Sequence, residues 1–596
     1  MIYLKEKGAY VFISLFLSLL VCGCNSESKK TQPIENEFQI LEKNYLNSLN
    51  TIKTQLDSMA MSSNKNDIES LYLKARKEFK WIEPILAFVD SENYKFLNQP
   101  NILKIEEEDL TDVKILDPTG FQVLEEHIFS DDFNIQTVTK HAKLTSNRIN
   151  FIKNNTNFNF LKNHHILWML RDQIIRTSLT GITGFDSPTE NSLEEAQYSY
   201  KSLIAILELF KNQFSDESLL SEWKTELNTS ISNLKSDFVS FNRYHFTKTH
   251  TTNALSLWKQ TVTDWKITFP FKKAINYETA SLFSDKTFNM NYFSNEKVDS
   301  ISQEKVELGE MLFYEKALSK NNSISCATCH QAEKYFTDGK KISTGVTRNS
   351  PTLLYAALQQ SFFYDNRAGS LEGQIVEVVN NANEFHTDLK HLETTVKSNK
   401  TYTNAFSKLY NEGITQDNVR NAIATYIRSL TPFNSKFDKN MNGLENTLTT
   451  SEINGYNIFN GKGKCATCHF PPLFNGTVPV AYKESEMELI GVPKTNDTIH
   501  AEINDDLGRY MVFKTTQRKH FFKTPTVRNI EKTAPYMHNG VFNTLEEVID
   551  FYNRGGGNGL GFNLELQTLP EDKLNLSKQE VTDLIAFMKT LTDSIY

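Results

Sequence analysis

The sequence is poor in cysteine, has no basic block and has no long apolar run beyond its first residues. Six cysteines among 596 residues leave none for disulfides or thiol catalysis, because four lie in two short motifs and the others, Cys22 and Cys24, lie in the leader. The net charge of −8, without clustered lysine and arginine, predicts no nucleic-acid partner. After the leader, no stretch is apolar enough to span a bilayer. All five tryptophans lie before residue 270, so the C-terminal half contains none.

Four of the six cysteines belong to two copies of Cys-Ala-Thr-Cys-His, at Cys326–His330 and Cys465–His469. In each copy, two thiols can add to the vinyl groups of one haem while the next imidazole ligates its iron. The alternatives are a pair of disulfides and a zinc site, which would use cysteines in fours or histidines at helical spacing. The sequence therefore predicts two covalently bound haem c groups. Their predicted attachment residues are Cys326, Cys329 and His330 for the first and Cys465, Cys468 and His469 for the second.

Residues 1–24 are predicted to be a lipoprotein signal peptide. Lys5 and Lys7 precede an apolar stretch at 9–21 that is too short for a comfortable membrane span, and a small residue precedes Cys24. The pattern resembles a bacterial lipobox, with Cys24 as the lipidated anchor residue. A plain secretory signal or a short membrane anchor is the alternative. Either reading places the mature protein on the periplasmic side.

Residues 35–265 carry no haem motif and have helical periodicity. An apolar stripe with steps of three and four residues predicts helix from 220 to 241: Leu220, Trp223, Leu227, Ile231, Leu234, Phe238 and Phe241. Gly120–Glu125 resembles the G-x-H-x-x-E signature of imelysin-like, iron-associated helical domains. Because Gln122 stands where that family has a metal-capable histidine, the sequence favours ordinary helix packing over a metal site.

Residues 300–445 and 446–596 are predicted to be two tandem cytochrome c-like domains. Each contains one Cys-Ala-Thr-Cys-His motif and closes with an amphipathic helix, the second of which begins at a capping box from Ser577 to Glu580. The predicted fold class is mainly α: a helical N-terminal domain at 35–265, a connector, a peroxidatic domain and an electron-transfer domain.

Motifs around both copies resemble those of the bacterial di-haem cytochrome c peroxidase and MauG superfamily, over about residues 300–596. These motifs include Phe336-Thr337-Asp338-Gly339, Arg348-Asn349-Ser350-Pro351-Thr352, Asp365-Asn366-Arg367-Ala368, Asp506-Leu507-Gly508-Arg509 and Lys523-Thr524-Pro525-Thr526-Val527-Arg528-Asn529. The resemblance implies a peroxidatic haem on His330 and an electron-transfer haem on His469. It also implies hydrogen peroxide as substrate, with a small cytochrome or another periplasmic carrier as donor.

The resemblance also assigns roles around the first haem. Peroxidases that need reductive activation carry a distal histidine after the first motif, but residues 331–349 contain none. We therefore expect an open sixth position on the first iron, unless a remote side chain such as His386 reaches it. Gln374 and Glu384, spaced as in the family, correspond to the distal pair. Glu384 is the expected acid and base, and Gln374 is expected to orient peroxide.

At the second haem and between the two haems, tyrosines replace residues usual in the family. Tyr552 stands where the peroxidases have a methionine ligand, which is similar to MauG and predicts an oxygen ligand on iron. The alternatives are a core tyrosine, or ligation by Met537 or, less directly, Met588. Tyr364 occupies the position of the inter-haem tryptophan, where it is expected to relay electrons.

A calcium site between the haems is the last implication of the resemblance. Its expected ligands are Asn349 and the carbonyl oxygens of Thr533 and Pro535, since oxygen ligands suit Ca²⁺. The predicted function is a di-haem peroxidase that reduces hydrogen peroxide to water. The alternatives are a MauG-like oxidase of a protein or organic substrate, and a non-catalytic electron carrier.

Overall fold

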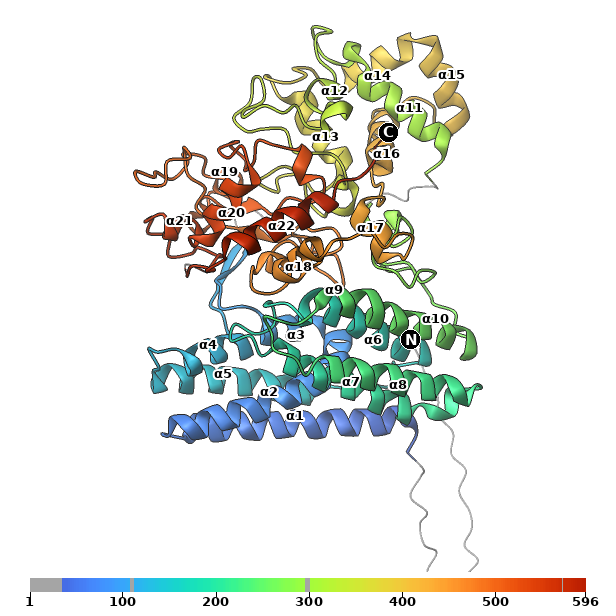
Figure 1. Ribbon diagram of the computed structural model, residues 1–596. Helices are drawn as coiled ribbons and strands as arrows, with labels where there is room; N and C mark the ends of the chain where they lie inside the picture. The colour runs from blue at the N-terminus through green and yellow to red at the C-terminus, as the bar shows by residue number, and fades with distance from the viewer. Residues whose placement is uncertain (1–34, 108–111, 295–300, 571, 596) are drawn as a thin grey trace, which may run out of the picture.

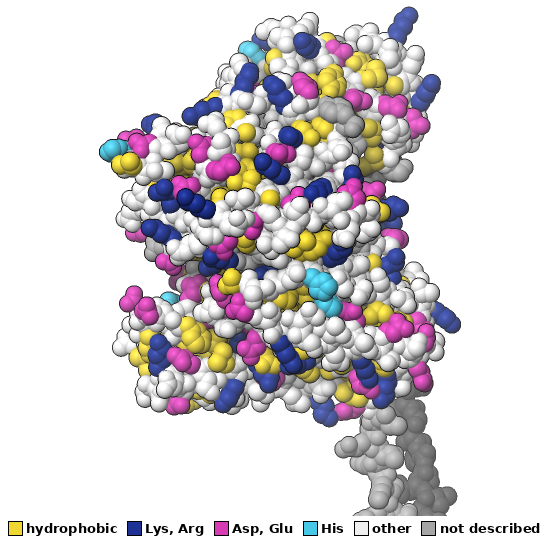
Figure 2. Space-filling view, in the orientation of Figure 1, with side chains coloured by type: hydrophobic (Ala, Val, Ile, Leu, Met, Phe, Trp, Pro, Cys, Tyr) yellow, Lys and Arg dark blue, Asp and Glu magenta, His cyan; other side chains and the backbone are white. Residues whose placement is uncertain are grey.

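The protein is mainly helical in the computed structural model, which describes residues 35–107, 112–294, 301–570 and 572–595. The predicted fold class is therefore confirmed. The predicted leader, with Cys22 and Cys24, lies outside the described residues. Within the described ranges, no helix combines the length and apolarity that crossing a bilayer requires. The face shown in Figure 2 mixes acidic and basic side chains.

In its described part, the N-terminal region contains ten α-helices and a hairpin. The helices are α1 (Glu37–Met61), α2 (Lys65–Val89), α3 (Ser91–Asn98), α4 (Phe121–Phe129), α5 (Ile135–Asn155), α6 (Asn163–Arg176), α7 (Ser192–Leu209), α8 (Glu217–Asn233), α9 (Arg243–His245) and α10 (Thr252–Asp264). In α1, which packs against α2 and α5, the buried side chains recur every three or four residues. The hairpin pairs β1 (Lys104–Glu107) with β2 (Val113–Leu116) in antiparallel register.

The helix predicted from 220 to 241 is shorter than its apolar stripe, so that prediction was wrong at its end. Helix α8 ends at Asn233, whereas Phe238 and Phe241 are buried from the loop that follows. The Asp237 carboxylate accepts hydrogen bonds from two backbone amides just after it, which stabilises a turn instead of a helix. The apolar spacing thus predicts correctly that Phe238 and Phe241 are buried, but it predicts wrongly that they belong to a helix.

The two motif-bearing halves follow along the chain. The first contains α11 (Gln303–Tyr314), α12 (Cys326–Cys329), α13 (Leu371–Asn380), α14 (Leu389–Ser398), α15 (Lys400–Leu409), α16 (Gln416–Ser429) and α17 (Lys436–Met441). The second contains α18 (Thr450–Phe459), α19 (Tyr510–Phe513), α20 (Leu545–Asn553), α21 (Gly556–Gly559), α22 (Lys578–Thr590) and a short antiparallel pair, β3 (Met487–Glu488) with β4 (Phe522–Lys523).

Each half closes with the same kind of helix crossing. Helix α11 packs against α16, and α18 packs against α22. A Cβ atom on Gly309 of α11 would lie 2.0 Å from the carbonyl oxygen of Ala422. A Cβ atom on Gly455 of α18 would likewise lie 2.0 Å from that of Asp583. Only glycine permits such close backbone approach, and the same arrangement occurs in both halves.

The N-terminal region packs on the second motif-bearing half, although the first half follows it in the chain (Figure 1). The backbone N–H of Tyr244 donates to Asn457 Oδ1 at 2.9 Å, and α9 lies against α18. The rings of Phe185 and Phe470 meet edge to face with centroids 5.4 Å apart. Since Phe470 follows His469 directly, the N-terminal region touches the loop of the second haem motif.

Candidate di-haem site

One continuous cavity of about 900 Å³ contains both Cys-Ala-Thr-Cys-His motifs. The structure brings the residues of the expected site to its walls, with the exception of the remote candidate His386. The lining residues include Cys326, Cys329, His330, Asn349, Tyr364, Gln374, Glu384, Cys465, Cys468, His469, Thr533, Pro535, Met537, Tyr552 and Met588. Residues from both halves of the chain therefore form one chamber.

Both motif histidines are held by one ring nitrogen. Nδ1 of His330 lies 3.0 Å from the carbonyl oxygen of Phe336, and Nδ1 of His469 lies 2.9 Å from that of Pro525. A carbonyl only accepts, so each Nδ1 carries the proton and each Nε2 keeps its lone pair. Burial lowers the pKa of His330 and lowers that of His469 to about 4, which maintains the neutral form that ligates iron.

No disulfide joins the four motif cysteines. Cys326 and Cys329 occupy positions i and i+3 of α12, so both point to one side of a single helical turn. Burial raises the pKa of Cys326 and of Cys465 to about 12, so these thiols are neutral. Two thiols and one imidazole on each of two walls of the cavity fit two haem c groups.

Glu384 lies next to the first motif. It follows α13, and one carboxylate oxygen accepts a hydrogen bond from Asn381 Nδ2 at 2.7 Å. Burial is the largest cause of the raised pKa of Cys326 and Cys329, and the negative charge of Glu384 raises both further. Burial also raises the pKa of Glu384 itself. Gln374, in α13, lines the same cavity.

Three histidines line the cavity within the described ranges, namely His330, His469 and His538. His538 stacks on Phe522 with ring centroids 3.8 Å apart, and its Nε2 lies 3.1 Å from Asn504 Oδ1. His386, the remote candidate ligand, is exposed and is not among the lining residues.

Tyr552 faces the second motif from α20. The helix begins at a capping box on Thr544, and its apolar face, which carries Tyr552, lines the cavity. Burial and then the neighbouring Cys468 and Cys465 raise the pKa of Tyr552. The ring thus lies near the second pair of haem-attaching cysteines. Met537 lines the cavity too, so it is still the alternative ligand.

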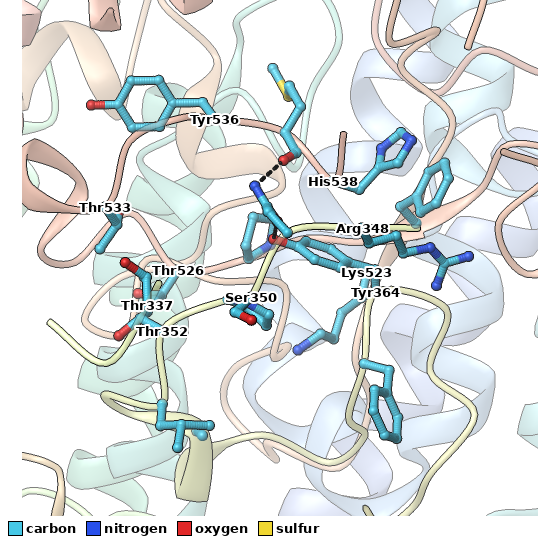
Figure 3. Close-up of a pocket in the computed structure, with 18 of the residues that line it drawn as sticks. Thr337, Arg348, Ser350, Thr352, Tyr364, Lys523, Thr526, Thr533, Tyr536 and His538 are labelled. Atoms are coloured by element: carbon cyan, nitrogen blue, oxygen red, sulfur yellow. Dashed lines mark hydrogen bonds between the residues drawn. The ribbon is translucent and has the colours of Figure 1, made fainter. Parts of the chain in front are cut away.

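Tyr364 is fixed at both its backbone and its hydroxyl. Its hydroxyl donates to Asn349 Oδ1 at 2.5 Å, and its carbonyl oxygen accepts from the backbone N–H of Lys523 at 2.7 Å. Burial raises the pKa of Tyr364. Figure 3 shows Tyr364 beside Lys523 and Arg348 in the pocket that both halves line.

Of the three expected calcium ligands, Asn349 and Pro535 are in contact, and Thr533 lines the same cavity. Nδ2 of Asn349 donates to the carbonyl oxygen of Pro535 at 3.2 Å and to that of Met537 at 2.8 Å. Because the amide nitrogen faces Pro535 here, a cation would require the amide to turn and present its oxygen. The calcium site stays a prediction.

Sequence reasoning missed the ionic groups between the two motifs. Arg348 binds the Asp506 carboxylate through two nitrogens, at 2.6 and 2.9 Å, and Asp365 through a third, at 2.7 Å. Lys523 donates to the Gln359 side chain, and burial lowers its pKa to about 8. These residues belong to the recognised motifs, but only the fold shows that they meet.

The imelysin-like segment is used for packing. The Glu125 carboxylate accepts hydrogen bonds from Tyr72 at 2.9 Å, from Ser187 at 2.5 Å and from Thr189. Gln122 donates to the carbonyl oxygen of Asn98 at 2.7 Å. Among the described residues, no group of three or more His, Cys, Asp or Glu side chains is arranged to hold a metal ion. These contacts favour the helix-packing interpretation.

The di-haem cytochrome c peroxidase family matches this chain over residues 303–446. The chain is 32% identical to a cytochrome-c peroxidase, IdrP2, of Denitromonas iodatirespirans, over 48% of this chain and 81% of the relative. It is 34% identical to the cytochrome c551 peroxidase of Nitrosomonas europaea, over 48% of this chain and 79% of the relative. It is 30% identical to the methylamine utilization protein MauG of Methylophilus methylotrophus, over 49% and 83%.

Among solved structures, a MauG-like protein associated with microbial copper homeostasis is similar. It is 28% identical and has a TM-score of 0.44, over 49% of this chain and 91% of that chain. The sequence relatives are covered over about four-fifths of their own lengths. Through its C-terminal half, the chain belongs to the di-haem cytochrome c peroxidase and MauG family.

Proposed function

We propose that the protein is a di-haem peroxidase that reduces hydrogen peroxide to water with electrons from a small periplasmic cytochrome or similar carrier. The observation that carries this proposal is a half-buried carboxyl, Glu384, beside the first motif in a cavity shared with the second. When bound, the haem on His330 would supply the iron that takes peroxide, and both haems would hold oxidising equivalents.

Glu384 performs the proton transfer. Reduction of one peroxide to two waters consumes two protons and two electrons, and heterolysis of the O–O bond is easier when the leaving oxygen is protonated, because it then leaves as water. A carboxylate next to the bound peroxide can take the proton of the near oxygen and return it to the leaving oxygen. The Asn381 amide holds one Glu384 oxygen, which leaves the other for the substrate. Gln374 orients peroxide through its amide.

The second half handles electrons. We assign Tyr552 as the oxygen ligand of the iron on His469, where it would lower the reduction potential relative to a methionine sulfur. We assign Tyr364, which lines the shared cavity and donates its hydroxyl to Asn349, as the electron relay between the haems. We keep three further parts of the proposal from the sequence: calcium at Asn349, Thr533 and Pro535, a lipid anchor at Cys24, and a periplasmic location.

A second candidate is a MauG-like oxidase that draws electrons from a protein or organic substrate. The position of Tyr552 next to the second motif favours it, because an oxygen ligand suits iron held in a high oxidation state. Both candidates share the peroxide chemistry at Glu384 and differ in the electron donor.

Peroxide turnover by the haem-loaded protein, with a reduced small c-type cytochrome as donor, tests the proposal. We expect Glu384→Gln to lower the rate by roughly 10²- to 10⁴-fold, since the proton carrier is lost while the shape is kept. Glu377→Gln is the control, because Glu377 is an exposed carboxylate of α13. An equal rate in wild type and Glu384→Gln would contradict the assignment, and turnover without any cytochrome dependence would favour the second candidate.

A further inference from the structure

The hairpin of the N-terminal region reaches into the second motif-bearing half. The Glu107 carboxylate, at the end of β1, accepts a hydrogen bond from Arg509 Nε at 2.8 Å. The two residues are 402 positions apart in the chain. Beside them, Arg518 donates to the carbonyl oxygen of Ile105 at 2.8 Å. The Glu107 side chain is 4% exposed, so its charge is buried at this junction.

Arg509 in turn holds residues 362–368, the loop that carries Tyr364 and that we call the inter-haem loop. Its Nη1 donates to the carbonyl oxygens of Asp365, at 2.9 Å, and Asn366, at 2.7 Å. One guanidinium plane therefore joins Glu107 at Nε to the inter-haem loop at Nη1. Because the guanidinium is rigid and planar, the carboxylate that orients Nε also aims Nη1 at the loop.

The loop needs such support from outside. A backbone hydrogen bond of 2.8 Å from Phe362 to Ala368 closes it. Within the loop, Phe363 has φ +64° and Asn366 has φ +55°. Residues other than glycine rarely adopt this left-handed backbone conformation. Arg348 and Arg367 bind the Asp365 carboxylate at 2.7 and 2.9 Å, but Arg509 binds the backbone itself.

We propose that Glu107 is a positioning residue for electron transfer between the two haems: through Arg509 it holds the backbone around Tyr364 in place. The role of Tyr364 as relay rests on the proposed function. The N-terminal helical region is thus a structural part of the di-haem unit, and its hairpin controls how closely Tyr364 is held between the motifs.

Two measurements on the full-length, haem-loaded protein test this role. The first is amide hydrogen exchange over residues 362–368. The second is the rate at which an electron, injected by a light pulse, reaches equilibrium between the haems. The variants are Glu107→Ala, which removes the acceptor, and Glu107→Gln, which keeps an acceptor oxygen for Nε. Glu106→Ala is the matched control, since Glu106 is the next residue of β1 and pairs with Lys104 at 2.8 Å on the surface.

We expect Glu107→Ala to speed exchange in 362–368 and to slow equilibration about tenfold, because small misplacements of reacting groups are costly. Glu107→Gln should fall between it and wild type, and Glu106→Ala should match wild type. Unchanged exchange and unchanged equilibration in Glu107→Ala would overturn the proposal, as would equal effects of Glu106→Ala. Exchange does not depend on peroxide, so faster exchange in a protein without peroxide turnover would sustain the positioning role and reject only the proposed function.

Discussion

Glu384 combines two properties that proton transfer to peroxide requires. It lies beside the first haem-attachment motif, and burial raises its pKa above the ordinary value of 4.5. A raised pKa brings the carboxyl closer to working pH, where giving and taking a proton cost comparable free energy. Glu377, on the same segment, is exposed on α13 instead.

The pH dependence of turnover follows from this shift. The carboxylate must be ionised to take the first proton from peroxide, so activity should fall as the pH decreases through the pKa of Glu384. Because that pKa is raised, the fall should begin at a higher pH than for an exposed glutamate. Initial rates measured across the acidic range check this. Glu384→Gln should lack the acidic limb; retention of the same limb would assign it to another group.

The identity of the second-haem ligand can be decided by substitution. If Tyr552 ligates the iron, Tyr552→Phe should change the spectrum of the second haem, and Tyr552→Met should raise its reduction potential. Met537→Leu should leave both unchanged. Spectroelectrochemical titration measures both quantities. The reverse pattern, with Met537→Leu altering the spectrum, would transfer the role to Met537.

Residues in short motifs were the part of the site that could be predicted from sequence. Cys326–His330 and Cys465–His469 carry their chemistry within five residues, so no fold is needed to recognise them. The Asn349 contact with Tyr364 and the Arg348 contact with Asp506 join separate motifs. Their partners depend on the tertiary fold, which spacing along the chain does not encode.

At the scale of elements, the stability of each half should depend on the helix pair that crosses at a glycine, Gly309 in the first half and Gly455 in the second. Gly309→Ala and Gly455→Ala each place a Cβ atom 2.0 Å from a facing carbonyl oxygen. We expect each to lower the free energy of unfolding by about 1–3 kcal/mol, because packed helices must separate. Thermal unfolding of the haem-loaded protein measures this. Gly369→Ala is the control, since a Cβ there meets nothing within 4 Å; an equal loss in the control would refute the explanation.

A helix boundary was predicted correctly where a capping motif accompanies the apolar stripe. It was predicted wrongly where the stripe alone was used. The capping box at Ser577 does begin α22, because its hydrogen bonds are local. The stripe from 220 to 241 runs past α8 because Phe238 and Phe241 are buried by tertiary packing. Apolar spacing reports which side chains are buried, and a turn centred on Asp237 can satisfy the same spacing.

For the whole molecule, the arrangement of the three parts could not be predicted from sequence. The N-terminal region contacts the second haem-motif loop through Phe185, and through Glu107 it contacts Arg509, which holds the inter-haem loop. Such contacts pair single residues across hundreds of positions and leave no periodic pattern. The sequence therefore predicted a separate helical domain at 35–265, but it did not predict which motif-bearing half this domain packs against.

Low-temperature EPR of the fully oxidised, haem-loaded protein tests the central claim most directly, because it reports the coordination of both irons at once. An open iron beside Glu384 and a six-coordinate iron facing Tyr552 predict a high-spin and a low-spin ferric signal together. Two low-spin signals would contradict the account, since a sixth ligand would then close the iron on His330.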